Sequence, residues 1–175
     1  MGIEHRRFEL IKIHDGFEIR RYSDSIQAIV SMPEKGNGGA SESFMRIAAY
    51  IFGSNDLSMK IPMTSPVHQW STMGKSRMAF IIPREYQIED LPIPNDDGIE
   101  LAEVPGGYAA VLRFSGFSGA RKTSKRTLML KKLIAETGYK KVSDPILAVY
   151  DNPSTTLPFL RRNEIIIPIQ WTPEG

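Results

Sequence analysis

The sequence contains no cysteine among its 175 residues. This absence excludes disulfide bonds, thiolate metal sites and catalysis by a thiol. The sequence also has no apolar run close to the roughly 20 residues that a membrane-spanning helix requires. The N-terminal stretch MGIEHRRFELIKIHDG lacks the apolar core of a signal peptide, and Arg6 stands where a myristoylation pattern requires serine or threonine. We therefore expect a cytoplasmic protein with no membrane partner.

Strong net charge and histidine clusters are also missing. The formal net charge is only +2, which is too small to indicate nucleic acid as a partner. The three histidines (His5, His14 and His68) do not stand at metal-ligand spacing. No Ser/His/Asp set with motif context and no phosphate-binding glycine loop is present. The sequence thus gives no catalytic residue, no metal ligand and no positive evidence for an enzyme.

The sequence does contain an internal repeat. FEIRRYSDSIQAIVSM, beginning at Phe17, matches IELAEVPGGYAAVLRF, which begins 82 residues later at Ile99. Each copy predicts a short strand, a turn and a longer strand. A helix is expected after each copy, over 41–52 with Ser41 as its N-cap and over 122–137 with Gly138 closing it. Two further strands follow each helix, and the last of each half contains Ile-Ile-Pro.

This repeat predicts one α+β domain over 1–175, built from two βαββ halves at about 17–86 and 99–170. The segment Leu91–Gly98, with two prolines and Asp96-Asp97-Gly98, is expected to link the halves. Because one helix per half cannot cover a large flat sheet, we expect the sheets to curl, with a ligand-sized cleft near the pseudo-twofold axis. We expect a monomer.

Five segments in order (FEIRRY, FGSN, MKIPMTSPV, FSGFSGARK and YDNP…RRNEIIIPI) resemble the SOUL haem-binding protein family, from about Phe17 to Ile169. The resemblance implies a distorted antiparallel β-barrel flanked by two long helices. It also implies non-covalent binding of haem or another tetrapyrrole. The axial histidine proposed in one branch of the family corresponds to Arg21 here. The basic residues proposed to meet the propionates correspond to Ser41 and Ala49.

The candidate ligand-binding residues come from the first helix, the MTSPV segment and the chain's last strand. The helix face at i, i+3 and i+7 and the nearby Arg46 supply one set, and Met63 is a flexible apolar residue or a weak thioether ligand. The 152–160 loop is expected to form a lip, and one of the two arginines after it to hold a ligand carboxylate. Together the predicted residues are Arg21, Phe44, Arg46, Ile47, Ile51, Met63, Phe159, Leu160, Arg161, Arg162 and Glu164.

Three features leave alternatives open. Met59, Met63, Met73 and Met78 suit either an irregular core or a flat apolar ligand. The basic run from Arg121 to Lys132 indicates either a solvated helix face or an anion site. The arginines of RRNE either pair with Glu164 or Glu18, or contact a ligand.

The favoured function is binding of haem or a porphyrin in an open hydrophobic cleft. One alternative is a binding or sensing domain for small amphipathic cations, because the SOUL family is similar in fold to the effector-binding domains of some bacterial transcription regulators. In those domains an acidic residue recognises the effector, and Glu164 is the candidate here. A weaker alternative is a hydrolase or haem-processing enzyme that uses a barrel carboxylate.

Overall fold

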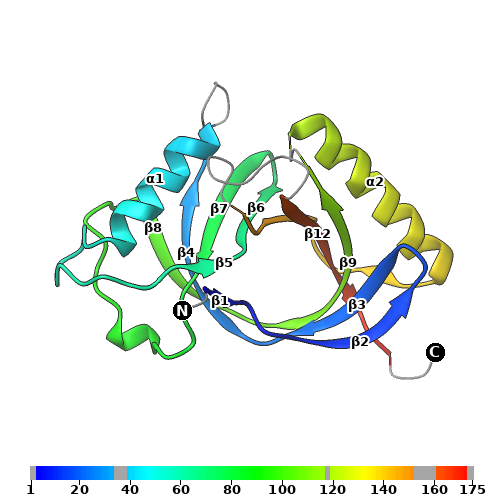
Figure 1. Cartoon of the computed structure of the whole chain (residues 1–175), viewed down its shortest axis with the longest axis horizontal. Coiled ribbons are helices and arrows are strands. Elements are labelled where there is room, and N and C mark those ends of the chain that lie inside the picture. Colours follow the sequence, from blue (N-terminus) through cyan, green and yellow to red (C-terminus); the bar gives the residue numbers. More distant parts are fainter. Residues whose placement is uncertain (1–2, 34–38, 117–118, 152–160, 173–175) are drawn as a thin grey trace. The chain divides into compact units, whose positions relative to one another are not determined.

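The computed structural model describes residues 3–33, 39–116, 119–151 and 161–172. Its helices are α1 (Gly39–Ile51), α2 (Ala120–Thr137) and the short 3-10 helix η1 (Ile88–Asp90) (Figure 1). Its strands are β1 (Glu4–His5), β2 (Phe8–His14), β3 (Phe17–Tyr22), β4 (Ser25–Ser31), β5 (Thr64–Ser65), β6 (Val67–Thr72), β7 (Lys75–Ile81), β8 (Ile99–Val104), β9 (Gly107–Ser115), β10 (Lys140–Lys141), β11 (Ile146–Val149) and β12 (Arg162–Gln170).

The chain forms two compact units. Unit 1 comprises Met1–Arg6 and Asp24–Pro105, and unit 2 comprises Arg7–Ser23 and Gly106–Gly175. Each unit contains one long helix and its own antiparallel strands, so the α+β class predicted from the sequence is confirmed. In each half of the sequence two strands (β3 and β4, then β8 and β9) precede the helix, and two main strands (β6 and β7, then β11 and β12) follow it, as the repeat predicts.

In unit 1 the strands run in the order β8-β4-β7-β6, with every neighbouring pair antiparallel. Helix α1 packs against β4 and β7. The core between them consists of Ala28, Val30, Ile47, Tyr50, Ile51, Ile61, Met78, Phe80, Ile82, Leu91 and Ile99. Met78 is therefore a core methionine and Met59 packs against the same core, whereas Met73 is 96% exposed.

In unit 2 the strands run in the order β2-β3-β9-β12-β11, again antiparallel, and the short β10 also pairs with β12. Because side chains alternate along a strand, this sheet has two different faces. One face packs against α2 through Phe17, Ile19, Ala110, Leu112, Phe114, Leu130, Ile134, Ile165, Ile167 and Ile169. The other face has a smaller apolar cluster beside its charged residues, made by Tyr22, Ala109, Val111, Ala148 and Ile166.

The two units do not follow the two sequence halves. The strand that opens the first half, β3, pairs with β9 of the second half, and β8 pairs with β4 of the first. Each unit is thus completed by a strand from the other repeat. The assignment of the whole chain to one domain stays a prediction.

The helix ends follow local chemistry. Gly138 ends α2 with φ at 87°, and its N–H donates to the carbonyls of Ile134 and Ala135, as expected for a glycine that closes a helix. The predicted start of α1 is wrong by two residues, because the helix begins at Gly39 and Ser41 lies inside its first turn.

Replacing Gly138 by alanine is expected to lower the free energy of unfolding by about 1 kcal/mol, because a Cβ disfavours a positive φ. Open space surrounds the position, so backbone strain is the main cause. Gly138→Asn should lose clearly less, since asparagine tolerates this conformation better. Urea denaturation would measure both variants, and equal losses would contradict the assignment.

Candidate functional site

One side of α1 carries apolar side chains that the core of unit 1 does not cover. Ser41, Met45, Ala49 and Phe52 follow one another at helical spacing, and all four are exposed. Met45 is 65% exposed and Phe52 is 58% exposed. The N–H of Phe52 donates to the Ala48 carbonyl at 2.9 Å, so Phe52 continues the helical turn. We call these four residues the α1 stripe.

The opposite side of α1 carries most of the residues predicted on this helix. Ile47 and Ile51 are buried in the core of unit 1, and Phe44 packs against that core. Arg46 donates from Nε and Nη2 to the two carboxylate oxygens of Asp96, at 2.7 and 2.9 Å. Paired hydrogen bonds of this kind fix a guanidinium firmly, so Arg46 ties α1 to the 91–98 segment.

The Arg46–Asp96 pair also shifts both protonation equilibria. The hydrogen bond from Arg46, with a further bond from the Gly98 N–H, lowers the pKa of Asp96 to about 2. The hydrogen bond to Asp96 likewise raises the pKa of Arg46. Both groups are therefore charged at neutral pH.

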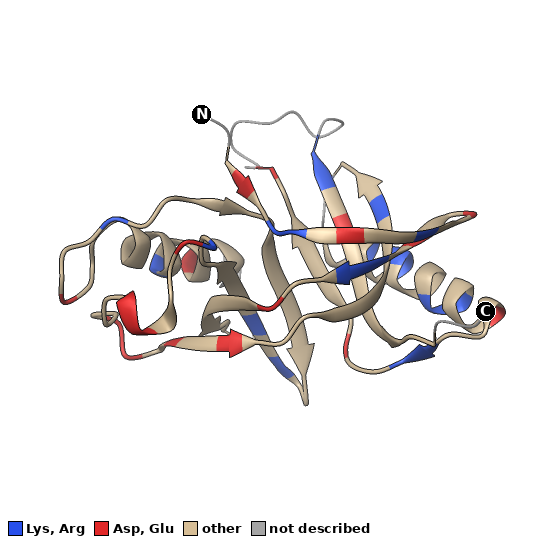
Figure 2. Cartoon of the chain, turned by 90° about the horizontal axis from the view of Figure 1, so that it is seen from below, with Lys and Arg blue, Asp and Glu red and all other residues tan. Residues whose placement is uncertain are grey.

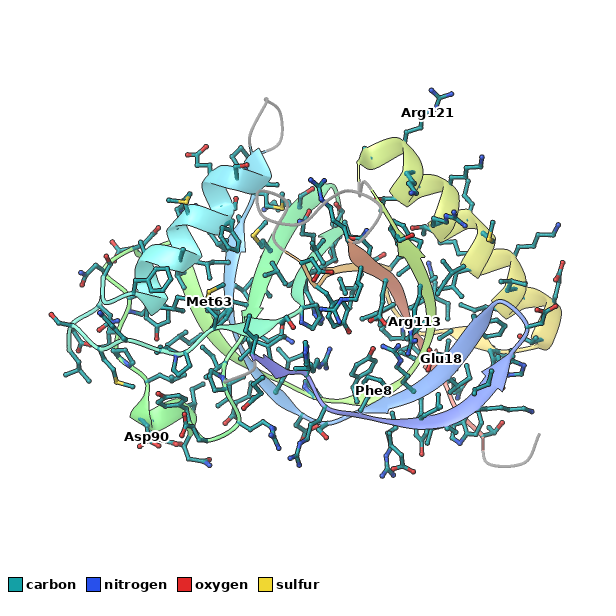
Figure 3. All side chains as sticks on the ribbon, in the orientation of Figure 1. Phe8, Glu18, Met63, Asp90, Arg113 and Arg121 are labelled. Carbon is teal, nitrogen blue, oxygen red and sulfur yellow. The ribbon has the colours of Figure 1, made fainter. Side chains whose placement is uncertain are left out.

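Met63 lies in unit 1 shortly after Ile61, whose N–H donates to the carbonyl of Ile51 at the end of α1. Its side chain is 40% exposed. Figure 3 shows it near the C-terminal end of α1. Of the residues predicted in unit 1, Met63 is the most accessible to a ligand.

Unit 2 holds a second group of polar side chains, on the sheet face opposite α2. Glu18, Arg20 and Tyr22 alternate along β3, Glu164 lies on β12, and Tyr150 follows β11. We call these residues, with Arg113 of β9, the Arg20 cluster. Arg20 is 1% exposed and Glu164 is 5% exposed, so two opposite charges lie inside the protein.

The guanidinium of Arg20 is held from several directions. Its Nη1 donates to Glu164 Oε1 at 3.0 Å and to the hydroxyl oxygen of Tyr22 at 2.9 Å. Its Nη2 donates to Glu164 Oε2 at 2.6 Å and to Glu18 Oε1 at 3.3 Å. The guanidinium carbon also lies 4.0 Å from the ring centre of Phe8, a cation–π contact. Only Nε has no partner among the described residues.

These contacts keep the guanidinium of Arg20 charged and the hydroxyl of Tyr150 protonated. Burial alone would lower the pKa of Arg20, but its hydrogen bonds to Glu164 and the nearby carboxylates outweigh burial and raise it. Burial and the charge of Glu164 raise the pKa of Tyr150. Tyr150 therefore stays protonated and donates its hydroxyl to Glu164 Oε1 at 2.6 Å.

Arg113 is the exposed member of the Arg20 cluster. Its side chain is 66% exposed, with Nη2 at 3.1 Å from Glu18 Oε1 and Nε at 3.5 Å from Glu164 Oε2. Figure 3 shows Arg113 beside Glu18, with Phe8 close by. The positive charges of Arg20 and Arg113 balance the negative charges of Glu18 and Glu164. The arrangement therefore leaves no uncompensated charge for a cationic or anionic ligand.

The remaining predicted residues of unit 2 lie at strand ends. Arg21 pairs with Glu9 at 2.7 Å on the exposed side of β3. Arg162 donates from Nε and Nη2 to Asp151, at 3.0 and 3.1 Å, and Arg161 is half-buried just before β12. Phe159 and Leu160 lie outside the described residues. Their predicted role as a lip stays a prediction.

Each of the three histidines is either hydrogen-bonded or buried. His14 Nε2 lies 2.8 Å from the Tyr139 hydroxyl, and the ring stacks on Phe17. His5 Nδ1 lies 2.6 Å from the Ser65 hydroxyl. His68 is 1% exposed, and burial together with the charge of Arg6 lowers its pKa to about 3. The described residues contain no group of three or more His, Asp or Glu side chains that could hold a metal ion.

The sequence analysis did not single out Arg20, Tyr22 or Tyr150. The alternation of Glu18, Arg20 and Tyr22 in FEIRRY places them on one face of a strand, which was a usable signal. Glu164, however, lies 144 residues from Arg20 in the sequence, and only the pairing of β3 with β9 and of β9 with β12 brings them together.

The chain belongs to the SOUL heme-binding protein family, whose model matches residues 3–168. It is 28% identical to "Heme-binding protein 2" of Homo sapiens over 162 residues, covering 88% of this chain and 78% of the relative. It is 26% identical to "Heme-binding protein 1" of Bos taurus, covering 71% and 67%.

The fold has structural relatives at much lower sequence identity. The chain matches the crystal structure of the EcmrR C-terminal domain with a TM-score of 0.69 at 11% identity. This match covers 89% of this chain and 98% of that one. At this identity the likeness shows a common fold.

Proposed function

We propose that this protein binds haem or another tetrapyrrole non-covalently, with the α1 stripe as its contact surface. Membership of the SOUL family and similarity to heme-binding proteins 1 and 2 support the class of ligand. The exposed apolar side chains of Met45 and Phe52 are the observation that carries the choice of surface. Ser41 and Ala49, which align with the family's proposed propionate contacts, lie on the same side of the helix.

The stripe suits a flat apolar ring in shape and chemistry. Ala49 is small and lies between two larger side chains, so a planar molecule can approach the helix there. Phe52 can stack on a macrocycle, and the flexible thioether of Met45 can adapt to its edge. Because a family propionate contact is replaced by Ala49, apolar burial has to supply more of the affinity here.

The described histidines offer no ready ligand for haem iron. His68 is buried, His14 contacts Tyr139 and Phe17, and His5 contacts Ser65. Arg21, at the family's proposed axial position, pairs with Glu9. The described residues therefore suit contact with the porphyrin ring rather than ligation of its metal.

Haemin and iron-free protoporphyrin are expected to bind within about tenfold of each other, a gap of roughly 1.4 kcal/mol, because no strong axial ligand distinguishes them. The double variant Met45→Gln/Phe52→Gln is expected to bind both at least about tenfold more weakly, since it removes apolar contact area. Spectral titration of the purified protein with each compound measures both effects.

The matched control is Ile93→Gln, which removes an exposed apolar side chain (67% exposed) from the same unit but outside α1. This variant should titrate like the unmodified protein. A sharp low-spin haem spectrum that is lost when a histidine is replaced would contradict the inference that no histidine ligates the haem iron. Equal affinities of the control and the double variant would overturn the α1 stripe as the site.

The cation-binding and hydrolase alternatives both require an available carboxylate at Glu164. Both of its oxygens accept hydrogen bonds, from Arg20 and Tyr150, so a ligand would first have to displace Arg20. The described geometry therefore favours the tetrapyrrole proposal. The expectation that Arg161 or Arg162 contacts a ligand carboxylate stays a prediction.

A further inference from the structure

Helix α2 carries a concentration of positive charge that the proposed function does not use. It contains six lysines and arginines and a single acidic residue, Glu136. The whole chain has 22 basic and 20 acidic residues, so the chain outside α2 has 16 and 19 and a net charge of −3. The near-neutral total thus conceals a strongly basic helix, whose ribbon carries several blue segments in Figure 2.

The stability of the helix does not explain these charges. Arg121 and Lys122 lie in the first turn, where the helix dipole disfavours cations, and no acidic residue lies there. Lys122 donates to the carbonyl of Ser115 at 2.6 Å, and Lys132 lies 4.0 Å from Glu136. Arg121, Lys125 and Lys131 have no acidic partner among the described residues. Figure 3 shows Arg121 pointing away from the protein.

Two exposed apolar side chains lie among the cations. Leu130 and Ile134 define the buried side of α2. At helical spacing, Arg121, Lys125 and Lys132 lie on the opposite side, with Leu128 and Met129 flanking them. Leu128 is 66% exposed and Met129 is 42% exposed. We call these five residues the α2 outer face.

We propose that the α2 outer face docks on the surface of an anionic lipid bilayer. Lysine and arginine side chains near a negatively charged membrane each strengthen binding, and their long stems reach headgroups while apolar neighbours enter the interface. The contact is peripheral, since no helix of the described residues is long and apolar enough to cross a membrane. This inference departs from the expectation, drawn from the lack of a long apolar run, a signal peptide and a myristoylation pattern, that the protein has no membrane partner.

The apolar pair favours lipid over other polyanions. Nucleic acid offers phosphates to the cations, but its backbone gives an exposed leucine and methionine no apolar environment. A bilayer interface accommodates both kinds of side chain at once. Binding to lipid should therefore depend on the charges and on Leu128 and Met129, whereas binding to nucleic acid should depend on the charges alone.

The test is co-sedimentation of the full chain with phosphatidylcholine vesicles that contain phosphatidylserine, beside pure phosphatidylcholine vesicles. We expect binding only to the anionic vesicles, and its loss at about 1 M salt, where the screening length falls to about 3 Å. Lys125→Gln/Lys132→Gln should weaken binding about 30-fold. Leu128→Gln/Met129→Gln keeps the charges and the helix propensity, and should weaken binding by at least about threefold.

The matched control is Lys140→Gln/Lys141→Gln, which removes two exposed lysines of unit 2 outside α2 and should leave binding unchanged. Circular dichroism checks that each variant is folded. No binding to anionic vesicles at low salt would overturn the proposal. So would unchanged vesicle binding by Leu128→Gln/Met129→Gln, or tighter binding of duplex DNA than of vesicles, because either result would make α2 a general polyanion surface.

Discussion

Replacing Arg20 by methionine is expected to lower the free energy of unfolding by about 3–5 kcal/mol, because it leaves the carboxylate of Glu164 buried and unpaired. Arg20 donates to both oxygens of Glu164, and both residues are almost fully buried. Methionine fills much of the same volume, so lost packing contributes little. Arg113, at 3.5 Å from Glu164, is exposed and can compensate only in part. Urea denaturation monitored by circular dichroism measures the loss.

The neighbouring arginine on the same strand provides the control. Arg21 makes an ion pair with Glu9 at 2.7 Å, but both side chains are more than half exposed. Arg21→Met should therefore cost no more than about 1 kcal/mol. Replacing both buried partners, in Arg20→Met/Glu164→Leu, should recover part of the stability lost in Arg20→Met. Equal losses of unfolding free energy for Arg20→Met and Arg21→Met would show that the buried carboxylate of Glu164 does not need the charge of Arg20.

Acidification from pH 7 to pH 5 is expected to remove about 2 kcal/mol of stability through His68 alone. His68 is covered by protein, its Nε2 has no hydrogen-bond partner among the described residues, and its pKa is lowered to about 3. In the unfolded chain the pKa returns to about 6.5. Between these values the unfolded chain binds a proton that the folded protein does not, so stability falls as the pH falls.

The measurement is the urea midpoint of the parent and of His68→Leu at pH 7 and at pH 5. The variant should lose about 2 kcal/mol less than the parent over this range, whatever its absolute stability. His14→Gln serves as control because its ring is only partly buried, and it should keep most of the parent's dependence. An NMR signal of the His68 ring that titrates near pH 6 would show that the residue is accessible to water.

Local periodicity was enough to predict the two long helices and the four main strands of each repeat, but not the N-terminal strands β1 and β2. The helices lie where apolar residues recur at helical spacing, and the strands where β-branched residues alternate, because both signals depend on neighbours in the sequence. The repeat likewise predicted that two strands precede and two strands follow the helix of each half. It could not show that β3 and β8 exchange between the repeats, because two similar strands can pair equally well with either copy.

The sequence also could not predict which individual side chains of α1 are buried. The spacing of α1 shows a helix but does not say how wide its covered side is. Phe44, Ile47 and Ile51 therefore looked available to a ligand, while Met45 and Phe52 went unnoticed. The packing of α1 on β4 and β7 covers the first set and leaves the second exposed.

The sequence by itself determined the α+β class, the two helices, the duplicated pattern and the family. The tertiary structure alone decided that Arg20 forms the buried ion pair with Glu164. The alternation in FEIRRY shows that Arg20 and Arg21 point to opposite faces of β3, but it does not say which face is buried. That choice depends on the register of β3, β9 and β12, which is set by contacts between residues far apart in the chain.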